Sequence, residues 1–67
     1  MNLNLRQAII QRVQNKSEQE LRDVIDASVG GDDKALPGLG VLFEIIWQHS
    51  GQTEQLQMVS TLKEHLG

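Results

Sequence analysis

The strongest constraint on the fold is a nearly continuous apolar run, Val41 to Trp47, in the middle of a 67-residue chain. On a helix with about 100° per residue, these side chains cover about two-thirds of the circumference, and Glu44 and Gln48 make the only polar stripe. We therefore expect this helix at the centre of the fold, with neighbours burying it on several sides. The run is far shorter than the ~20 residues that span a bilayer, so we expect no membrane segment.

The N-terminal segment predicts a first, amphipathic helix. Its apolar residues recur at helical spacing, and Asn2 or Asn4 can cap its start because a short side-chain oxygen accepts a free first-turn N–H. The helix should fray around Asn15. The residues that define its apolar face are Leu5, Ala8, Ile9 and Val13, with Ile10 on the flank.

The second helix has the clearest start signal in the chain. In "SEQE", Ser17 and Glu20 are spaced to bond each other's backbone N–H groups as a capping box. Arg22 lies one helical turn before Asp26, and Gly30 is placed to end the helix in the left-handed conformation. The predicted inner face consists of Leu21, Val24, Ile25 and Ser28.

The segment "GGDDKA", residues 30–35, predicts a short polar linker and is the best candidate for a mobile loop. The third helix should run from about Pro37 or Gly38 to about His49, with Pro37 presetting the first turn. The "GLG" that follows Pro37 lacks the preceding strand and the Gly-Lys-Ser/Thr ending of a phosphate-binding loop. We expect Gly38 and Gly40 instead to permit close approach of a neighbouring backbone.

A turn at residues 50–53 precedes the predicted fourth helix, for which Thr53 is the expected cap. The apolar face of this helix consists of Leu56, Val59, Leu62 and Leu66, with Met58 and Lys63 at its edges. The sequence thus predicts one domain, residues 1–67, with an all-α fold. We expect a compact bundle of four short helices with the third (about 37–49) central.

A core of this size buries only about 60% of the surface of the unfolded chain, so its stability should be marginal. The sequence has no cysteine, which excludes disulfides and thiolate metal sites and fits a reducing compartment. Self-association then remains as the available support, and we expect a homodimer. The candidate interface residues are Phe43, Ile46 and Trp47. Trp47 is the expected anchor, because aromatic side chains commonly anchor interfaces. A different protein partner that completes the core around Phe43 and Trp47 is an alternative.

The net charge of −3 disfavours nucleic-acid coating, which depends on Lys and Arg. The first 17 residues nevertheless carry no acid. Arg6, Arg12 and Lys16 are therefore candidates for weak phosphate contacts, although they fall at different angles around the helix. The alternative function is accordingly a weak DNA-associated protein that uses its basic N-terminal helix.

No constellation of residues predicts an enzyme, a metal site or a cofactor. Glu44 has no positioned partner for acid–base catalysis and is expected on the solvent stripe. His49 and His65 lie near helix C-termini, where an imidazolium favours the negative helix end, and capping is a more common role than a pH switch. No secretory signal is visible, so we expect a soluble cytoplasmic protein.

Four segments of the chain resemble the small acid-soluble spore protein I family of endospore-forming bacteria: "MNLNLRQAII", "EQEL", "LPGLGVLFEIIW" and "STLKEHL". The resemblance runs from Met1 to the C-terminus, and it departs from the family in "GGDDK" and "QRVQNKSEQ". It implies a minor, non-enzymatic protein produced in the forespore during sporulation and resident in the spore core. The resemblance supplies no catalytic residue, no ligand and no established molecular mechanism, and we expect a structural or protein-interaction role. The family is distinct from the DNA-coating acid-soluble spore proteins.

Overall fold

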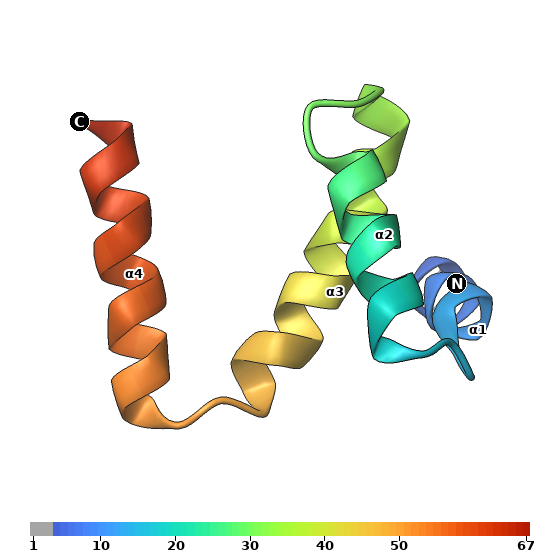
Figure 1. Ribbon diagram of the computed structural model, residues 1–67, viewed down its shortest axis with the longest axis horizontal. Helices are drawn as coiled ribbons and strands as arrows, with labels where there is room; N and C mark the ends of the chain where they lie inside the picture. The colour runs from blue at the N-terminus through green and yellow to red at the C-terminus, as the bar shows by residue number, and fades with distance from the viewer. Residues whose placement is uncertain (1–3) are drawn as a thin grey trace.

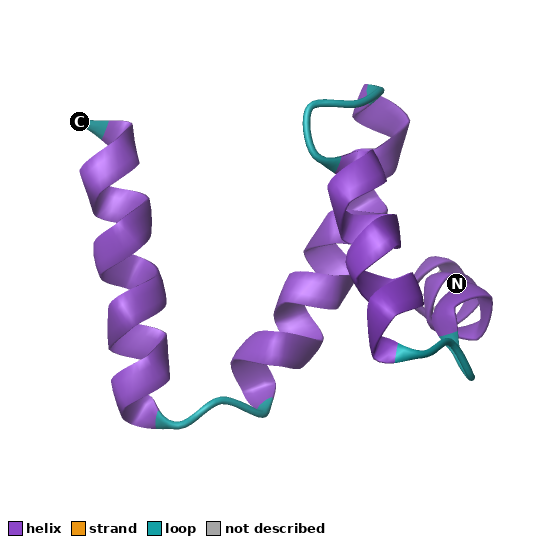
Figure 2. Cartoon of the chain, viewed as in Figure 1, coloured by secondary structure: helices purple, strands orange, loops and turns teal. Residues whose placement is uncertain are grey.

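A computed structural model describes residues 4–67 of the chain. The elements are α1 (Asn4–Val13), α2 (Glu18–Ser28), the short 3₁₀ helix η1 (Asp33–Ala35), α3 (Leu36–Gln48) and α4 (Gln52–Leu66), as Figure 1 shows. Figure 2 shows helices joined by loops and no strand in this part of the chain. The prediction of an all-α fold with four short helices is confirmed.

The predicted apolar face of α1 is only partly covered. Ile9, Val13 and the flanking Ile10 are half-buried, whereas Leu5 and Ala8 are exposed. Asn15 has φ 64°, in the left-handed region where asparagine is enriched, and it turns the chain out of the helix. The helix therefore ends near the predicted position. Asn4 is the first residue of α1, whereas the alternative cap, Asn2, lies outside the described residues.

The capping box of α2 is confirmed. The Ser17 hydroxyl accepts a hydrogen bond from the backbone N–H of Glu20 at 3.1 Å, and the Glu20 carboxylate accepts one from the backbone N–H of Ser17 at 2.8 Å. Gly30 takes φ 71°, which confirms the predicted left-handed helix end. The inner face is also as predicted, since Leu21, Val24, Ile25 and Ser28 are all half-buried.

The linker prediction is wrong for residues 33–35, which form η1. The Asp32 carboxylate accepts from the backbone N–H of Lys34 at 2.9 Å, and the Asp32 carbonyl accepts from Ala35 at the same distance. Local side-chain capping by aspartate thus organises a stretch that composition alone predicted to be a loop. Pro37 lies in the first turn of α3, as predicted.

α3 occupies the centre of the fold, packing against α1, α2 and η1, and this prediction is confirmed. The expected role of its glycines is wrong. A Cβ atom added at Gly38 or Gly40 would meet nothing within 4 Å, so no neighbouring backbone of the chain approaches either residue.

The start of α4 differs from the prediction. Gly51, and not Thr53, is the N-cap, and the Glu54 carboxylate accepts a hydrogen bond from the Gly51 N–H at 2.5 Å. In Figure 1, α4 extends from the end of α3 and stands apart from α1 and α2. Of its side chains only Gln55 and Met58 are half-buried, and the others are exposed.

The chain exposes much more surface than folded proteins of its mass. Its accessible surface is 5674 Å², whereas the general scaling gives about 4,250 Å². Its radius of gyration is 13.2 Å, against about 11 Å expected for a compact domain of this length. None of the side chains that the structure describes is fully buried. α3 therefore has neighbours on several sides, but they cover it incompletely.

Candidate interaction surface

The end of α3 is held by side chains that follow it in the sequence. His49 Nδ1 lies 2.9 Å from the carbonyl oxygen of Ile45. The Ser50 hydroxyl donates to the Ile46 carbonyl at 2.6 Å. The Gln55 side-chain amide donates to the Trp47 carbonyl at 2.8 Å. The same carbonyls also accept backbone hydrogen bonds from His49 and Ser50, so the side chains add a second contact to each of them at the helix end. They also fix the turn between α3 and α4, and thus the direction in which α4 leaves.

His65 Nδ1 lies 2.8 Å from the carbonyl oxygen of Thr61 in α4. This contact repeats the His49–Ile45 arrangement, four residues apart, near the end of the other long helix. Both histidines therefore occupy positions that suit the predicted capping role.

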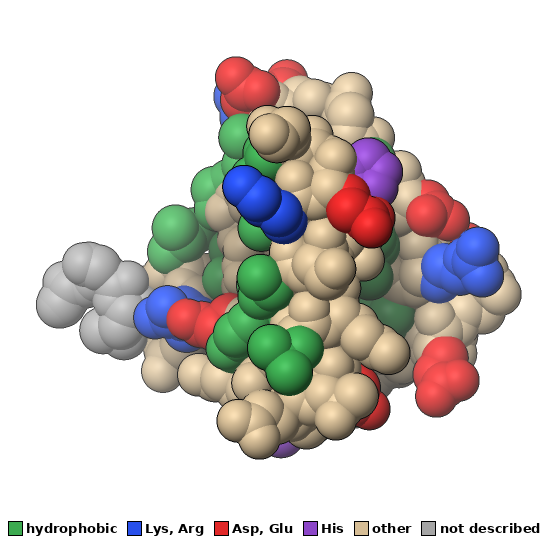
Figure 3. All heavy atoms as spheres, turned by 90° about the vertical axis from the view of Figure 1, so that its left-hand side faces the viewer, with side chains coloured by type: hydrophobic (Ala, Val, Ile, Leu, Met, Phe, Trp, Pro, Cys, Tyr) green, Lys and Arg blue, Asp and Glu red, His purple; other side chains and the backbone are tan. Residues whose placement is uncertain are grey.

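Apart from Leu36 at the start of α3, six large apolar side chains of α3 and α4 remain exposed, and together we call these six the exposed apolar set. Figure 3, which views the molecule from the α4 side, shows hydrophobic side chains on this face. The exposed fractions run from 46% for Ile46 to 74% for Leu66. Monomeric proteins rarely leave large apolar surfaces uncovered, and such surfaces commonly mark interaction sites. The set consists of Phe43, Ile46, Leu56, Val59, Leu62 and Leu66.

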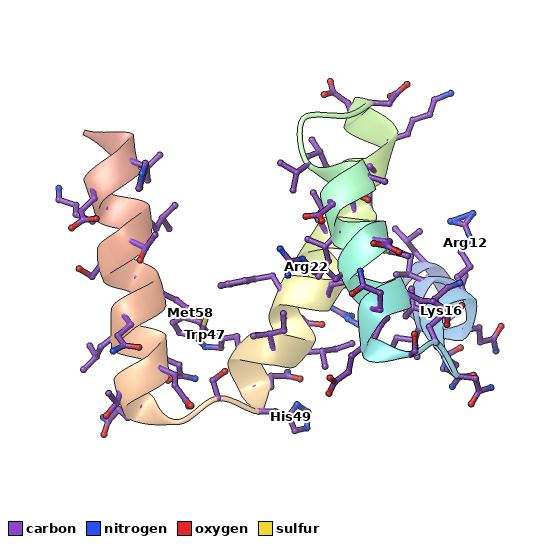
Figure 4. The ribbon with its side chains drawn as sticks, in the orientation of Figure 1. Arg12, Lys16, Arg22, Trp47, His49 and Met58 are labelled. Carbon is purple, nitrogen blue, oxygen red and sulfur yellow. The ribbon has the colours of Figure 1, made fainter. Side chains whose placement is uncertain are left out.

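The three candidate interface residues occupy different environments. Phe43 and Ile46 are 50% and 46% exposed, whereas Trp47 is half-buried. The rings of Phe43 and Trp47 pack with centroids 5.7 Å apart and planes at 41°. Figure 4 shows Trp47 pointing from α3 toward α4, and Met58 pointing from α4 toward α3. Trp47 thus contributes to packing within the chain, and Phe43 and Ile46 are the accessible members.

A small groove opens beside Ile46, where α1, α2 and α3 meet. Its volume is about 230 Å³, and every residue that lines it is aliphatic. We call it the aliphatic groove. Because it contains no charged side chain, an apolar group can enter it without desolvating a charge. The residues are Val13, Leu21, Ile25, Leu42, Ile45 and Ile46.

A second groove, of about 430 Å³, combines an apolar floor with three cations, Arg12, Lys16 and Lys34, and no acidic residue lines it. We call it the basic-rimmed groove. Arg12 and Lys16 lie on the side of the molecule away from α4 (Figure 4). The structure therefore brings together two of the three candidate phosphate contacts. Arg6 is not among the lining residues.

Arg6 instead binds Glu44 of α3. Arg6 Nε lies 2.7 Å from Glu44 Oε1, and Arg6 Nη2 lies 2.9 Å from Oε2. The hydrogen bond to Glu44, together with the negative charge of the carboxylate, raises the pKa of the Arg6 guanidinium above its usual value. Sequence reasoning missed this pair, because the two residues are 38 positions apart and only the docking of α1 on α3 brings them together. The sole hint was a lone acid in an apolar helix.

The described residues 4–67 contain no group of three or more His, Cys, Asp or Glu side chains placed to hold a metal ion. Within the same residues, no helix is both long enough and apolar enough to cross a membrane.

The fold and these surfaces define a class: a small, open helical protein whose distinctive features are uncovered apolar and basic surfaces. Residues 3–66 match the family model described as "Small, acid-soluble spore protein I". The chain belongs to this family, which confirms the resemblance noted in the sequence, and it is therefore a small spore protein.

Curated relatives carry the same description. The protein from Bacillus licheniformis is 48% identical, with 98% of this chain and 96% of the relative covered. The protein from Geobacillus sp. is also 48% identical, with 96% and 92% covered. The one from Bacillus subtilis (strain 168) is 47% identical, with 94% and 90% covered. No solved structure matches the chain.

Proposed function

We propose that this chain is a non-enzymatic protein of the forespore and spore core that acts through protein–protein contacts, and that its first partner is a second copy of itself. The observation that carries this proposal is the exposed apolar set on α3 and α4. Membership of a spore protein family supports the setting in the spore.

The electrostatic features fit structural roles better than catalytic ones. The pKa of Arg6 is raised by its bond to Glu44, which joins two helices. The pKa of Glu20 is lowered by the backbone N–H of Ser17, in the capping box of α2. Displaced pKa values often mark functional sites, but structural contacts displace them too. Both displacements here arise from contacts that hold the fold.

Sedimentation equilibrium from low to high micromolar concentration tests the self-association. We expect a dimer in the upper part of this range, and Phe43→Asp should weaken it at least tenfold. Gln48→Asp is the matched control, because it adds the same charge to an exposed position on the same helix. A wild-type chain that stays monomeric at high micromolar concentration overturns the proposed self-association.

Weak DNA association is the second candidate, favoured by the three cations of the basic-rimmed groove. The engagement of Arg6 with Glu44 and the net charge of −3 oppose it. Titration into duplex DNA at low salt is the test, because the attraction is electrostatic and strongest there. Binding that weakens in an Arg12→Gln/Lys16→Gln variant supports this candidate, and the absence of binding at low salt ends it.

A further inference from the structure

We propose that the homodimer forms by exchange of α4, so that α4 of each copy packs its apolar face into the aliphatic groove of the other. This inference rests on the proposed self-association and adds to it the partner surface and its location. The donor is the apolar face of α4, and the acceptor is the groove formed by α1, α2 and α3.

The exposed area is sufficient for such a dimer. The accessible surface exceeds the value for a compact protein of this mass by roughly 1,400 Å². A typical specific interface buries about 800 Å² on each partner. One chain therefore has enough surplus surface to form a stable interface and still expose an ordinary amount afterwards.

α4 is the element that most lacks contacts. Every residue from Val59 to Gly67 is exposed, so the second half of the helix receives little cover from its own chain. Leu62 and Leu66 are 56% and 74% exposed. Isolated helices shorter than about 12–15 residues are marginal in water, and most helix stability comes from packing an apolar face. A 15-residue helix that packs only at its beginning therefore needs an external surface.

The geometry of the α3–α4 turn separates α4 from the aliphatic groove of its own chain. The hydrogen bond from Gln55 to the Trp47 carbonyl holds the start of α4 beside the end of α3, and Trp47 is directed toward α4 (Figure 4). Ile46, which lines the groove, lies about 100° from Trp47 around α3. α4 therefore covers the Trp47 side, and Ile46 stays 46% exposed beside an open groove.

A second copy suits both halves of the contact. The groove is entirely aliphatic, and the face of α4 that carries Leu56, Val59, Leu62 and Leu66 is apolar, so the two match chemically. Each chain carries such a helix and such a groove. Two copies can therefore form two identical contacts related by a two-fold axis, which closes the assembly as a dimer.

Cross-linking between two singly substituted chains tests the exchange, since the sequence contains no cysteine. A Leu62→Cys chain is mixed with an Ile25→Cys chain and treated with a short bifunctional thiol reagent. We expect a hetero-linked product several-fold above that of the control mixture, Gln57→Cys with Ile25→Cys. Gln57 is exposed and lies about 140° from Leu62 around α4, so the exchange leaves it facing solvent.

Leu62→Glu provides an independent measurement. This position is 56% exposed in the single chain, so the substitution leaves the monomer folded, which far-ultraviolet circular dichroism checks. We expect the dimer dissociation constant to rise at least tenfold, and Gln57→Glu to leave it unchanged. A dimer that neither cross-links through Leu62 and Ile25 nor weakens in Leu62→Glu overturns the exchange but leaves the proposed function. A chain that is monomeric at all concentrations overturns both.

Discussion

The guanidinium of Arg6 and the carboxylate of Glu44 form two side-by-side hydrogen bonds, of 2.7 and 2.9 Å, between α1 and α3. A bidentate arginine–carboxylate pair fixes direction as well as distance, because the planar fork matches the two carboxylate oxygens. The pair therefore sets how α1 lies on the central helix. It also engages one of the three basic side chains that a phosphate contact from α1 would use.

The first prediction concerns the energetic coupling of this pair. Arg6→Gln and Glu44→Gln should each lower the free energy of unfolding, and the double variant should lose less than the sum, because one interaction is counted twice. The side chains are 61% and 38% exposed, so 1 M NaCl should reduce the coupling. Urea unfolding of the four proteins measures it. Strictly additive losses at low salt would contradict the prediction.

A matched comparison is available in α2. Arg22 Nε lies 3.7 Å from Asp26 Oδ2, and these side chains are 77% and 69% exposed. The same cycle with Arg22→Gln and Asp26→Gln should give a smaller coupling, because the contact is longer and more solvated. Equal couplings in the two pairs would show that the bidentate geometry has no special effect.

The second prediction tests the capping box. Ser17→Ala removes the hydroxyl that accepts from the Glu20 N–H, and it should destabilise the protein by about 1 kcal/mol. Ser60 is exposed in the interior of α4, so Ser60→Ala makes the same chemical change without removing a cap. It should leave stability unchanged or raise it slightly, because alanine is the better helix former. Urea unfolding followed by circular dichroism compares the two variants.

The third prediction is a pH dependence from Glu20. Hydrogen bonding from the backbone and side chain of Ser17 lowers the pKa of this carboxyl below its usual value in the folded state. A lowered folded-state pKa contributes stability that is present above the unfolded-state pKa and lost as the pH falls through the folded-state pKa. Glu20→Gln removes the titration. The stability advantage of the wild type over Glu20→Gln should therefore shrink as the pH is lowered from 7 through the acidic range.

Urea midpoints of the two proteins at a series of pH values measure this difference. An advantage that stays constant, or that grows toward acid, would show that the capping carboxylate does not titrate as described. Because only one side chain differs between the two proteins, the other acidic groups contribute equally to both curves.

Local signals were sufficient to predict some elements from the sequence. The capping box at Ser17 and the left-handed Gly30 depend on contacts within four residues, and both were predicted correctly. The central place of α3 followed from its apolar circumference. The Arg6–Glu44 pair and the grooves could not be predicted, because they depend on how separate helices dock. The cap at Gly51 was missed because the competing Thr53 is the stronger capping residue by type.

The glycines of α3 illustrate the same limit and give the fourth prediction. They suggested a close helix contact, yet a Cβ at Gly40 would meet nothing within 4 Å, and Gly40 is exposed. Glycine in a helix interior costs about 1 kcal/mol relative to alanine. Gly40→Ala should therefore stabilise the protein by about that amount.

Gly30→Ala provides the control for Gly40→Ala. A Cβ at Gly30 also meets nothing within 4 Å, but φ is 71°, a conformation that strains an L-residue. This variant should lose about 1 kcal/mol, because open space does not relieve backbone strain. Urea unfolding at a concentration below the dimer range measures both variants on the single chain. If Gly40→Ala destabilises the protein there, a contact within the chain must approach α3 at this glycine, contrary to the open geometry.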